Sequence, residues 1–176
     1  MLIMLLILDV DGVLTNGKKY YDASGRGMLK TFCDRDFTAI KKFKAAGWHV
    51  VFLSGDPNVN EAVAKNRNIP FYCNRVDGKM VNKVTFLDKL CKEYNVRKDQ
   101  TVYIGDDVFD IDIIKAVKYG FCPDDADLDV KQIAISLNSK GGECCISELY
   151  RYFQVSGLVK PVTLEEIEAV DRHERF

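Results

Sequence analysis

Residues 2–15 read LIMLLILDVDGVLT. An uninterrupted apolar run from Leu2 to Leu8 leads directly into Asp9, Asp11 and Gly12. Such a run, closed by turn residues, is typical of a strand that is buried on both faces in a parallel sheet. It is too short to span a membrane, and it lacks the preceding positive charge and the cleavage site of a signal peptide. The stretch therefore predicts a central strand whose end carries two carboxylates.

Downstream of this strand, short apolar segments alternate with segments of helical periodicity. Strands are predicted at His49–Leu53, near Phe71, and at Thr101–Ile104, Tyr119–Cys122 and Ile133–Ser136. Helices are predicted from Phe37 to Gly47, and at Asn60–Asn68, Val81–Tyr94, Phe109–Val117 and Cys144–Phe153. Before the first helix, aromatic and apolar residues on both sides of a turn at 22–27 indicate a β-hairpin at about residues 18–32. The alternation predicts an α/β, Rossmann-like fold with a parallel sheet covered by helices on both faces.

The bulk composition suits one compact domain. The chain has 176 residues, of which 47% are apolar, and a formal net charge of −1. There is no excess of basic residues that would indicate binding to nucleic acid or to an anionic membrane. The six cysteines form no Cys-x-x-Cys pair, which argues against a zinc site. Without a secretory context, we expect reduced thiols in a cytoplasmic protein. We expect one domain at residues 1–157 and a tail at 158–176, where a capping box of Thr163 and Glu166 predicts a short helix.

Polar residues follow three of the predicted strands at the point where each strand ends. Asp9 and Asp11 follow the first strand, Ser54-Gly55-Asp56 the second, and Gly105-Asp106-Asp107 the strand at 101–104, with Asp110 close behind. In open α/β sheets, ligands bind at the carboxyl ends of the strands. We therefore expect Asp9, Asp11 and Asp106 to converge. Because like charges repel, the group requires a cation, and oxygen ligands of this kind favour Mg²⁺.

The same sheet edge carries groups that suit a phosphate. The hydroxyl of Ser54 and the backbone N–H groups around Gly55 can hold phosphate oxygens. A lysine at the start of the following helix, Lys83 or alternatively Lys79, adds a positive charge. This inventory fits phosphoryl transfer, in which catalysis consists mostly of positioning and charge neutralisation.

Asp9 is the predicted nucleophile. The two histidines, His49 and His173, lie outside any recognisable constellation, so nothing activates a serine or a cysteine. A carboxylate is already ionised at neutral pH and can form an aspartyl-phosphate intermediate. Asp11 can protonate the leaving group and later deprotonate water. Gly12 allows the tight turn that aims both side chains.

These motifs resemble those of the haloacid dehalogenase superfamily of phosphotransferases. The resemblance implies that Asp9 is the nucleophile and Asp11 the acid/base. It also implies a metal held by Asp9, by the backbone carbonyl at Asp11 and by Asp106, with Asp107 and Asp110 in support. The number of residues between Lys83 and Gly105-Asp106-Asp107 looks like the separation found in the family. The resemblance therefore implies Lys83 as the phosphate-binding lysine, with Lys79 as the alternative.

The chain is similar to one small branch of this superfamily, which has no cap domain. The similarity rests on Asp9–Thr15, the tyrosine-containing hairpin, Arg35-Asp36, Gly105-Asp106-Asp107 and Gly141-Gly142. The branch includes phosphatases of 3-deoxy-octulosonate 8-phosphate and of nonulosonate (KDN or acylneuraminate) 9-phosphates. It implies a phosphorylated sugar acid as substrate and a homotetramer in which a neighbour covers the active site. Spacing independently leaves no room for a lid domain before His49 or between Asp56 and Lys83.

Three further residues bear on the substrate. Asp56 and Glu143 stand where the octulosonate enzymes usually carry basic residues, which favours a nonulosonate substrate. Both are also ordinary surface charges in a plainer interpretation. Arg35 is either a substrate contact or part of an ion pair with Asp36 at a helix start. Phe37, Cys144 and Cys145 depart from the usual pattern of the branch.

Three other functions stay open at this point. One is a phosphotransferase or mutase, which would pass the same intermediate to an acceptor other than water. A similar domain can be non-catalytic, although the complete set of acids argues against this. A phosphatase of this kind can also act on an exposed phosphate of a macromolecule. Each motif alone has a plain interpretation: Asp-x-Asp-Gly is a common polar turn, and Ser54 alone would be a helix N-cap. The order and spacing of all four elements favour the phosphatase.

Overall fold

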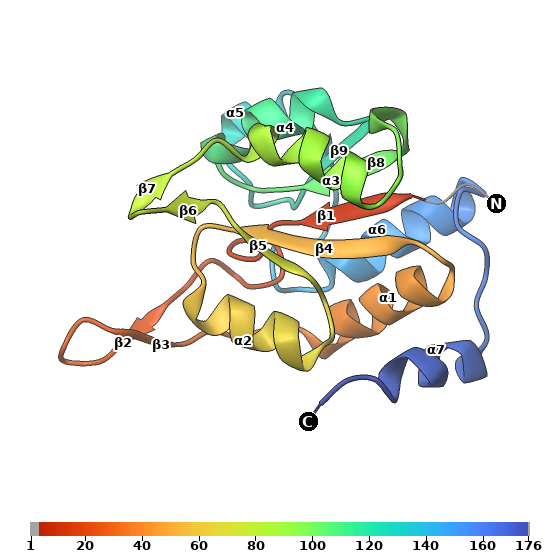
Figure 1. Ribbon diagram of the computed structural model, residues 1–176, viewed down its shortest axis with the longest axis horizontal. Coiled ribbons are helices and arrows are strands. Elements are labelled where there is room, and N and C mark those ends of the chain that lie inside the picture. Colours follow the sequence, from red (N-terminus) through yellow and green to blue (C-terminus); the bar gives the residue numbers. More distant parts are fainter. Residues whose placement is uncertain (1–3, 176) are drawn as a thin grey trace.

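The core of the molecule is a six-stranded parallel sheet in the order β10-β9-β8-β1-β4-β5 (Figure 1). The computed structural model describes residues 4–175. The strands are β1 (Leu5–Leu8), β4 (His49–Ser54), β5 (Phe71–Cys73), β8 (Thr101–Ile104), β9 (Tyr119–Cys122) and β10 (Ile135–Ser136). The predicted α/β fold is confirmed. The first strand was expected to begin at Leu2, but Leu2 and Ile3 lie outside the described residues, and β1 begins at Leu5.

Helices cover both faces of the sheet (Figure 1). α3 (Leu87–Glu93), α4 (Ile111–Ala116) and α5 (Leu128–Lys131) lie on one side, and α1 (Asp34–Ala45), α2 (Asn58–Asn66) and α6 (Cys145–Val155) on the other. The helices predicted from Val81 and Phe109 differ at their starts, where the chain forms the 3-10 turns η1 (Lys83–Phe86) and η3 (Val108–Asp110). Both turns follow a capping side chain, that of Asn82 or Asp107, which accepts a hydrogen bond from the backbone. A third turn, η2, spans Lys98–Gln100.

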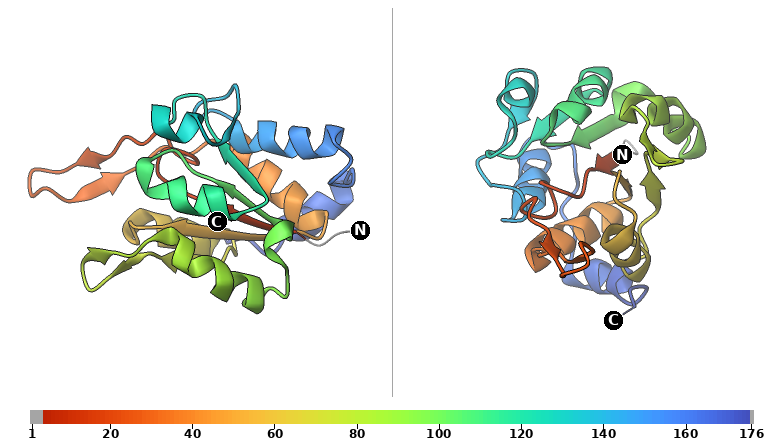
Figure 2. Two further views of the ribbon diagram at one scale, coloured as in Figure 1. Left: turned by 90° about the horizontal axis from the view of Figure 1, so that it is seen from above. Right: turned by 90° about the vertical axis from the view of Figure 1, so that its left-hand side faces the viewer.

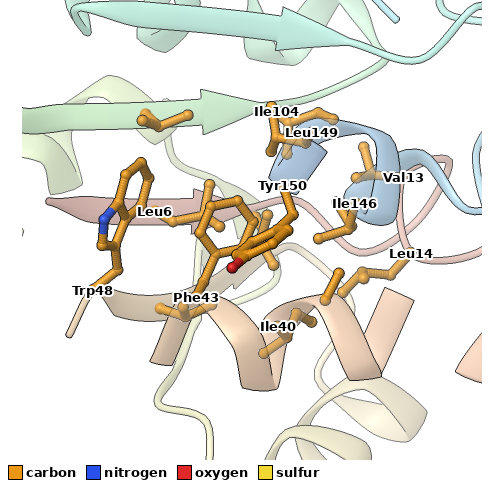
Figure 3. Close-up of a cluster of buried hydrophobic side chains, with 14 of the residues drawn as sticks. Leu6, Val13, Leu14, Ile40, Phe43, Trp48, Ile104, Ile146, Leu149 and Tyr150 are labelled. Atoms are coloured by element: carbon orange, nitrogen blue, oxygen red, sulfur yellow. The ribbon is translucent and has the colours of Figure 1, made fainter. Parts of the chain in front are cut away.

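Strand β1 divides the core into two halves because its side chains alternate between the faces of the sheet. Leu6 and Leu8 pack with α1 and α6, where Phe43, Trp48 and Tyr150 form an aromatic cluster (Figure 3). On the opposite face, Leu5 and Ile7 belong to a second cluster with residues of α3, α4 and α5. The continuous apolar run thus reflects burial on both faces, and it fixes the position of the acids that follow it.

Two hairpins project beyond the carboxyl ends of the strands (Figures 1 and 2). The first, β2 (Tyr20–Tyr21) with β3 (Gly27–Leu29), lies within the region where a hairpin was predicted. The second, β6 (Arg75–Val76) with β7 (Lys79–Met80), was not predicted. Its turn, Asp77–Gly78, has φ angles of 49° and 76°, and an Asp-Gly dipeptide in this conformation is a common hairpin turn.

The C-terminal segment packs on the domain. Helix α7 (Leu164–Asp171) begins at Thr163, whose side chain forms the predicted capping box with Glu166. Lys41 on α1 pairs with Asp171, and Glu174 lies 2.9 Å from Arg67. The division into a domain at 1–157 and a tail at 158–176 stays a prediction. Among residues 4–175, no helix is long and apolar enough to cross a bilayer.

Candidate active site

The carboxyl ends of β1, β4 and β8 meet at a cavity of about 280 Å³. Asp9 follows β1, Ser54 ends β4 and Asp106 follows β8 by two residues. All three line the cavity, together with Asp11, Gly55, Asp56, Lys83, Asp107 and Asp110. The adjacency of the three strands in the sheet therefore brings together side chains that are up to 97 positions apart, from Asp9 to Asp106.

Lys83 forms the centre of the charge network in this cavity. Its Nζ atom lies 2.8 Å from Asp9 Oδ2 and 2.7 Å from Asp110 Oδ1, and the side chain is almost completely buried. Burial opposes the charged form, but the carboxylates of Asp9 and Asp110 outweigh it and raise the pKa of Lys83 above its ordinary value. The alternative lysine, Lys79, is exposed on β7 and does not line the cavity. The structure thus brings Lys83 to the site.

Asp110 holds this lysine in position through hydrogen bonds. One carboxylate oxygen accepts hydrogen bonds from Lys83 and from the hydroxyl of Tyr103 at 2.6 Å. The other accepts from the backbone N–H groups of Asp106 and Asp107 at 3.0 and 3.1 Å. Both oxygens of Asp110 are therefore fully engaged within the protein. Tyr103 was missed by sequence reasoning, because it belongs to the apolar pattern of β8.

Carboxylate oxygens of Asp9, Asp106 and Asp110 lie within 4.8 Å of one another. Burial, together with the negative charges of Asp9 and Asp110, raises the pKa of Asp106 to about 8. Burial also raises the pKa of Asp9 to about 7, although Lys83 opposes the shift. Oδ1 of Asp106 is buried without a hydrogen-bond partner. A divalent cation fits these observations, and with Asp110 already engaged, Asp9 and Asp106 are the carboxylates able to hold it.

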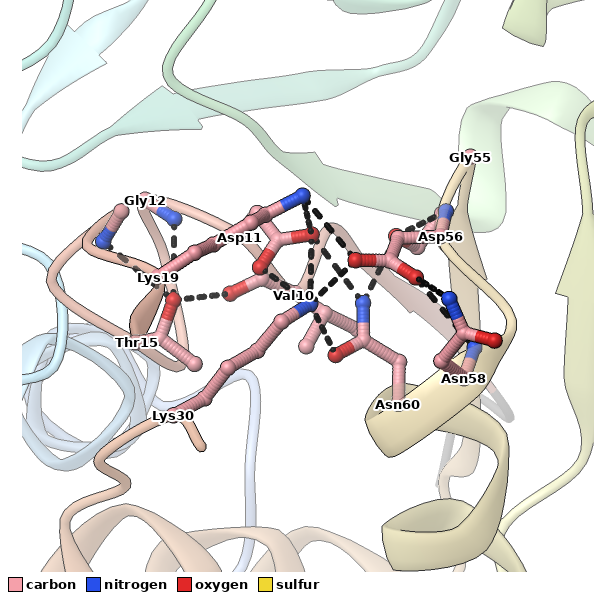
Figure 4. Close-up of polar contacts among 12 residues, drawn as sticks. Val10, Asp11, Gly12, Thr15, Lys19, Lys30, Gly55, Asp56, Asn58 and Asn60 are labelled. Carbon is pink, nitrogen blue, oxygen red and sulfur yellow. Dashed lines mark hydrogen bonds and ion pairs between the residues drawn. The ribbon is translucent and has the colours of Figure 1, made fainter. Parts of the chain in front are cut away.

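The expectation that the Asp11 carboxylate joins this group is corrected. It turns instead toward Lys30 of the first hairpin, whose Nζ atom lies 2.8 Å from Asp11 and 2.8 Å from Asp56 (Figure 4). Lys19 lies 2.9 Å from Asp56, and Asn60 bonds to both Asp11 and Lys30. Two ammonium groups, at 2.8 and 3.7 Å, therefore pair with the Asp11 carboxylate, which is not part of the group formed by Asp9, Asp106 and Asp110. Sequence reasoning missed Lys30 and Asn60, because neither belongs to a recognisable motif.

Ser54 and Asp56 are held by the same network. The Ser54 side chain accepts a hydrogen bond from Asn60 at 3.0 Å, which leaves its hydroxyl hydrogen available to a bound anion. It does not cap α2, whose N-cap is Pro57. Burial disfavours ionised Asp56, but hydrogen bonds from Lys30 and Lys19 prevail and hold the pKa of Asp56 below its ordinary value.

Two glycines permit the close approach of three backbone segments. Gly12 has a φ angle of +82°, and a Cβ atom there would lie 1.9 Å from Asp106 Oδ2. A Cβ atom on Gly141 would lie 1.9 Å from the carbonyl oxygen of Gly12. The glycine pair at 141–142 thus packs against the loop after β1. Arg35 and Glu143 are exposed and line neither this cavity nor the larger recess beside it.

Of the paired cysteines, Cys145 is completely buried and contacts the carbonyl of Val13. Cys144 adopts a left-handed backbone conformation with a φ angle of +72°, and its sulfur lies 3.5 Å from that of Cys33.

Comparison with known proteins places the chain in a family. Residues 56–138 match the model of a haloacid dehalogenase-like hydrolase. The 3-deoxy-D-manno-octulosonate 8-phosphate phosphatase KdsC of Haemophilus influenzae is 34% identical over 150 residues, which cover 84% of this chain and 80% of that protein. The chain belongs to the haloacid dehalogenase-like hydrolases. It is a phosphatase, as the sequence predicted.

Solved structures agree with this assignment. The cobalt-bound deoxy-D-mannose-octulosonate 8-phosphate phosphatase YrbI of Haemophilus influenzae is 34% identical and superposes with a TM-score of 0.80, covering 89% of this phosphatase and 90% of that chain. A 3-deoxy-D-manno-octulosonate 8-phosphate phosphatase of Moraxella catarrhalis, solved with magnesium, phosphate and KDO, shares the fold with a TM-score of 0.77 at 21% identity, covering 97% and 90% of the two chains.

Cation binding to this phosphatase is expected to weaken as the pH falls. The folded, cation-free protein binds protons at Asp9 and Asp106 more tightly than the unfolded chain, because their pKa values are raised to about 7 and about 8. The stability that these protons provide is present below the unfolded pKa and is lost as the pH rises through the folded values. Mg²⁺ should therefore raise the melting temperature more at pH 8 than at pH 6. Its apparent Kd should increase by more than about tenfold when the pH is lowered from 8 to 6. Thermal shift and calorimetric titration measure both, with Asp106→Asn as control. A pH-independent Kd would contradict the account.

Substitution of Gly12 should disrupt cation binding through Asp106. Gly12→Ala places a methyl group on the Asp106 carboxylate, whereas Gly17, which has a similar φ angle of +70°, has its nearest other atom at 3.7 Å from an added Cβ. Both variants should lose roughly 1 kcal/mol of stability from backbone strain. Only Gly12→Ala should weaken Mg²⁺ binding by more than about tenfold, as measured by calorimetry at pH 8. Equal binding losses in both variants would argue that backbone strain, not the contact with Asp106, is responsible.

Proposed function

We propose that this phosphatase hydrolyses a phosphorylated sugar acid in a Mg²⁺-dependent reaction through an aspartyl-phosphate on Asp9. The observation that carries the proposal is the pair formed by Asp9 and Lys83 at 2.8 Å within the cavity at the sheet edge. A carboxylate beside a fixed ammonium group, with a serine hydroxyl on the same cavity wall, provides a nucleophile and two groups that bind phosphate oxygens.

In the first step, a carboxylate oxygen of Asp9 attacks phosphorus, and the bond between phosphorus and the sugar oxygen breaks. The leaving oxygen takes a proton from the carboxylic acid of Asp11. Lys83, Ser54 and the backbone N–H at Gly55 bind the phosphoryl oxygens, whose charge is spread over the group during transfer. Asp110 holds Lys83 in place, and Asp107 caps the turn that presents Asp110.

In the second step, a water molecule attacks the phosphorus of the aspartyl-phosphate. The Asp11 carboxylate takes a proton from this water, the acyl-phosphate bond breaks, and Asp9 is regenerated with release of inorganic phosphate. Asp11 lies two residues after Asp9 and lines the same cavity, so its carboxylate can serve both steps. Lys30 and Asn60 fix the position from which it does so.

Asp9, Asp106 and the backbone carbonyl of Asp11 are the groups that would hold the Mg²⁺ ion. When bound, the ion supplies positive charge that offsets the buried carboxylates and the phosphoryl oxygens. Two observations support this assignment: Oδ1 of Asp106 is buried without a hydrogen-bond partner, and the pKa values of Asp9 and Asp106 are raised.

The substrate class is supported by the surroundings of the cavity. A second recess of about 790 Å³ adjoins it and is lined by four cationic side chains and one carboxylate, that of Asp56. Such a recess suits an anionic, hydroxyl-rich leaving group. The Haemophilus influenzae relative is named for octulosonate 8-phosphate. Within the class, octulosonate 8-phosphate and a nonulosonate 9-phosphate are the two candidates, and selection between them by Asp56, Arg35 and Glu143 stays a prediction.

Assembly into a cytoplasmic homotetramer is part of the proposal. Tyr20, Tyr21 and Leu29 on the first hairpin are 55%, 63% and 66% exposed, and a projecting apolar surface of this kind is typical of a subunit contact. A neighbour docked there would cover the recess between this hairpin and α2.

The covalent step is tested with p-nitrophenyl phosphate, whose leaving group needs no proton. Asp9→Asn should lower kcat by at least about 1000-fold while the fold is retained. Asp11→Asn should still release about one equivalent of nitrophenol per subunit in a rapid burst and then turn over slowly, because the intermediate forms but is not hydrolysed. Mass spectrometry of acid-quenched Asp11→Asn should locate one phosphoryl group on the peptide that contains Asp9.

A phosphoryl group on another residue, or turnover by Asp9→Asn near the wild-type rate, would remove Asp9 from its role. Comparison of kcat/KM for octulosonate 8-phosphate, nonulosonate 9-phosphates and neutral sugar phosphates then tests the substrate class.

A further inference from the structure

The hairpin β6–β7, residues 75–80, forms one wall of the entrance to the active site. In the chain it follows β5 and precedes Lys83, so its second strand leads directly to a residue of the catalytic cavity. Its base is fixed by Asn74, which is buried and bonds to Val81 through its side chain at 2.8 Å and through its carbonyl oxygen at 2.7 Å. The hairpin projects on the same side of the molecule as β2–β3 (Figures 1 and 2).

Cross-strand pairing decides which side chains of this hairpin face the site. Arg75 pairs with Met80 and Val76 with Lys79, and the two pairs point to opposite faces because side chains alternate along a strand. Arg75 and Met80 both line the catalytic cavity, whereas Val76 and Lys79 do not. Met80 lies against Gly55, the residue that follows β4.

Arg75 stands at the boundary between the two cavities, since it lines both of them. Its Nε atom donates to the carbonyl oxygen of Gly55 at 3.0 Å and Nη1 to that of Gly78 at 3.2 Å. These contacts orient the guanidinium group without neutralising it, and among residues 4–175 Arg75 forms no ion pair. The other nitrogen, Nη2, retains donors that can bind an anion.

The neighbouring cations differ from Arg75 either in pairing or in position. Lys19 and Lys30 are each paired with the carboxylates of Asp11 and Asp56. Arg26 lines only the larger recess, on the side of the first hairpin. Arg75 is therefore the unneutralised cation placed where a phosphate ester in the inner cavity would extend its organic part into the recess.

We infer that Arg75 binds the carboxylate of the sugar-acid substrate and determines the selectivity of the enzyme for acidic over neutral phosphate esters. The inference rests on the proposed function, because it needs a substrate that carries both a phosphate and a carboxylate. A guanidinium group suits this role, since it presents several N–H donors in a plane that matches a carboxylate. The phosphate end would remain with Ser54 and Lys83, and Arg75 would hold the far end.

The test compares two substrates that differ at one group: 3-deoxy-octulosonate 8-phosphate, and the corresponding octulose 8-phosphate in which a hydroxymethyl group replaces the carboxylate. The variants are Arg75→Gln, Arg75→Lys and, as a matched control on the other face of the same hairpin, Lys79→Gln. Arg75→Gln should lower kcat/KM for the acid at least about 30-fold, mainly through KM, and change the neutral substrate less than about twofold. Arg75→Lys should lose less, and Lys79→Gln should match wild type.

The outcomes separate this inference from the proposed function. If wild type prefers the acid and Arg75→Gln keeps that preference, or if Arg75→Gln lowers both substrates equally, the assignment of Arg75 is wrong and the proposed function stands. Loss of the preference in Arg26→Gln alone would likewise overturn it in favour of the first hairpin. If wild type shows no preference for the acid, the sugar-acid function and the role of Arg75 both fail, while turnover of p-nitrophenyl phosphate still shows a phosphatase.

Discussion

The ammonium group of Lys83, buried between the carboxylates of Asp9 and Asp110, is the interaction on which the rest of the site depends. Buried charges are tolerated only when they are paired and hydrogen-bonded. Here one cation faces three converging carboxylates, so an excess of negative charge remains. Burial, with a contribution from this excess, raises the pKa values of Asp9 and Asp106, and a second cation would offset the remaining charge. The same imbalance that disfavours the cation-free site would thus favour the binding of a metal.

The fold supplies this arrangement through close backbone contacts. The parallel pairing of β1 with β4 and β8 sets three strand ends side by side, and glycines at 12 and 105 leave room for the carboxylates of Asp106 and Asp110. The two hairpins add a second layer at the entrance. The first delivers Lys30 to Asp11 and Asp56, and the second presents Arg75. The sheet therefore positions the carboxylates around Lys83, and the two hairpins contribute side chains to the lining of the cavity and of the recess beside it.

The sheet could be predicted from sequence because each of its central strands is an apolar run that ends at acids or a serine, and the spacing between Asp9, Ser54, Lys83 and Asp106 fits one topology. The direction of the Asp11 side chain could not be predicted. It depends on Lys30, whose approach is set by the tertiary position of a projecting hairpin and not by any local pattern. Asp110 likewise resembled a supporting acid, and only the geometry shows that all its oxygen lone pairs are used. The β6–β7 hairpin had a detectable signal in Asp77-Gly78, but its two short exposed strands gave no apolar alternation.

Diffraction from crystals grown with Mn²⁺, a cation with the same preference for oxygen ligands as Mg²⁺, tests the central claim directly. The account predicts an anomalous peak at about 2.1 Å from carboxylate oxygens of both Asp9 and Asp106, with Lys83 still bonded to Asp110. A peak held by Asp11 and Asp56 instead, or no peak between Asp9 and Asp106 at saturating Mn²⁺, would contradict it.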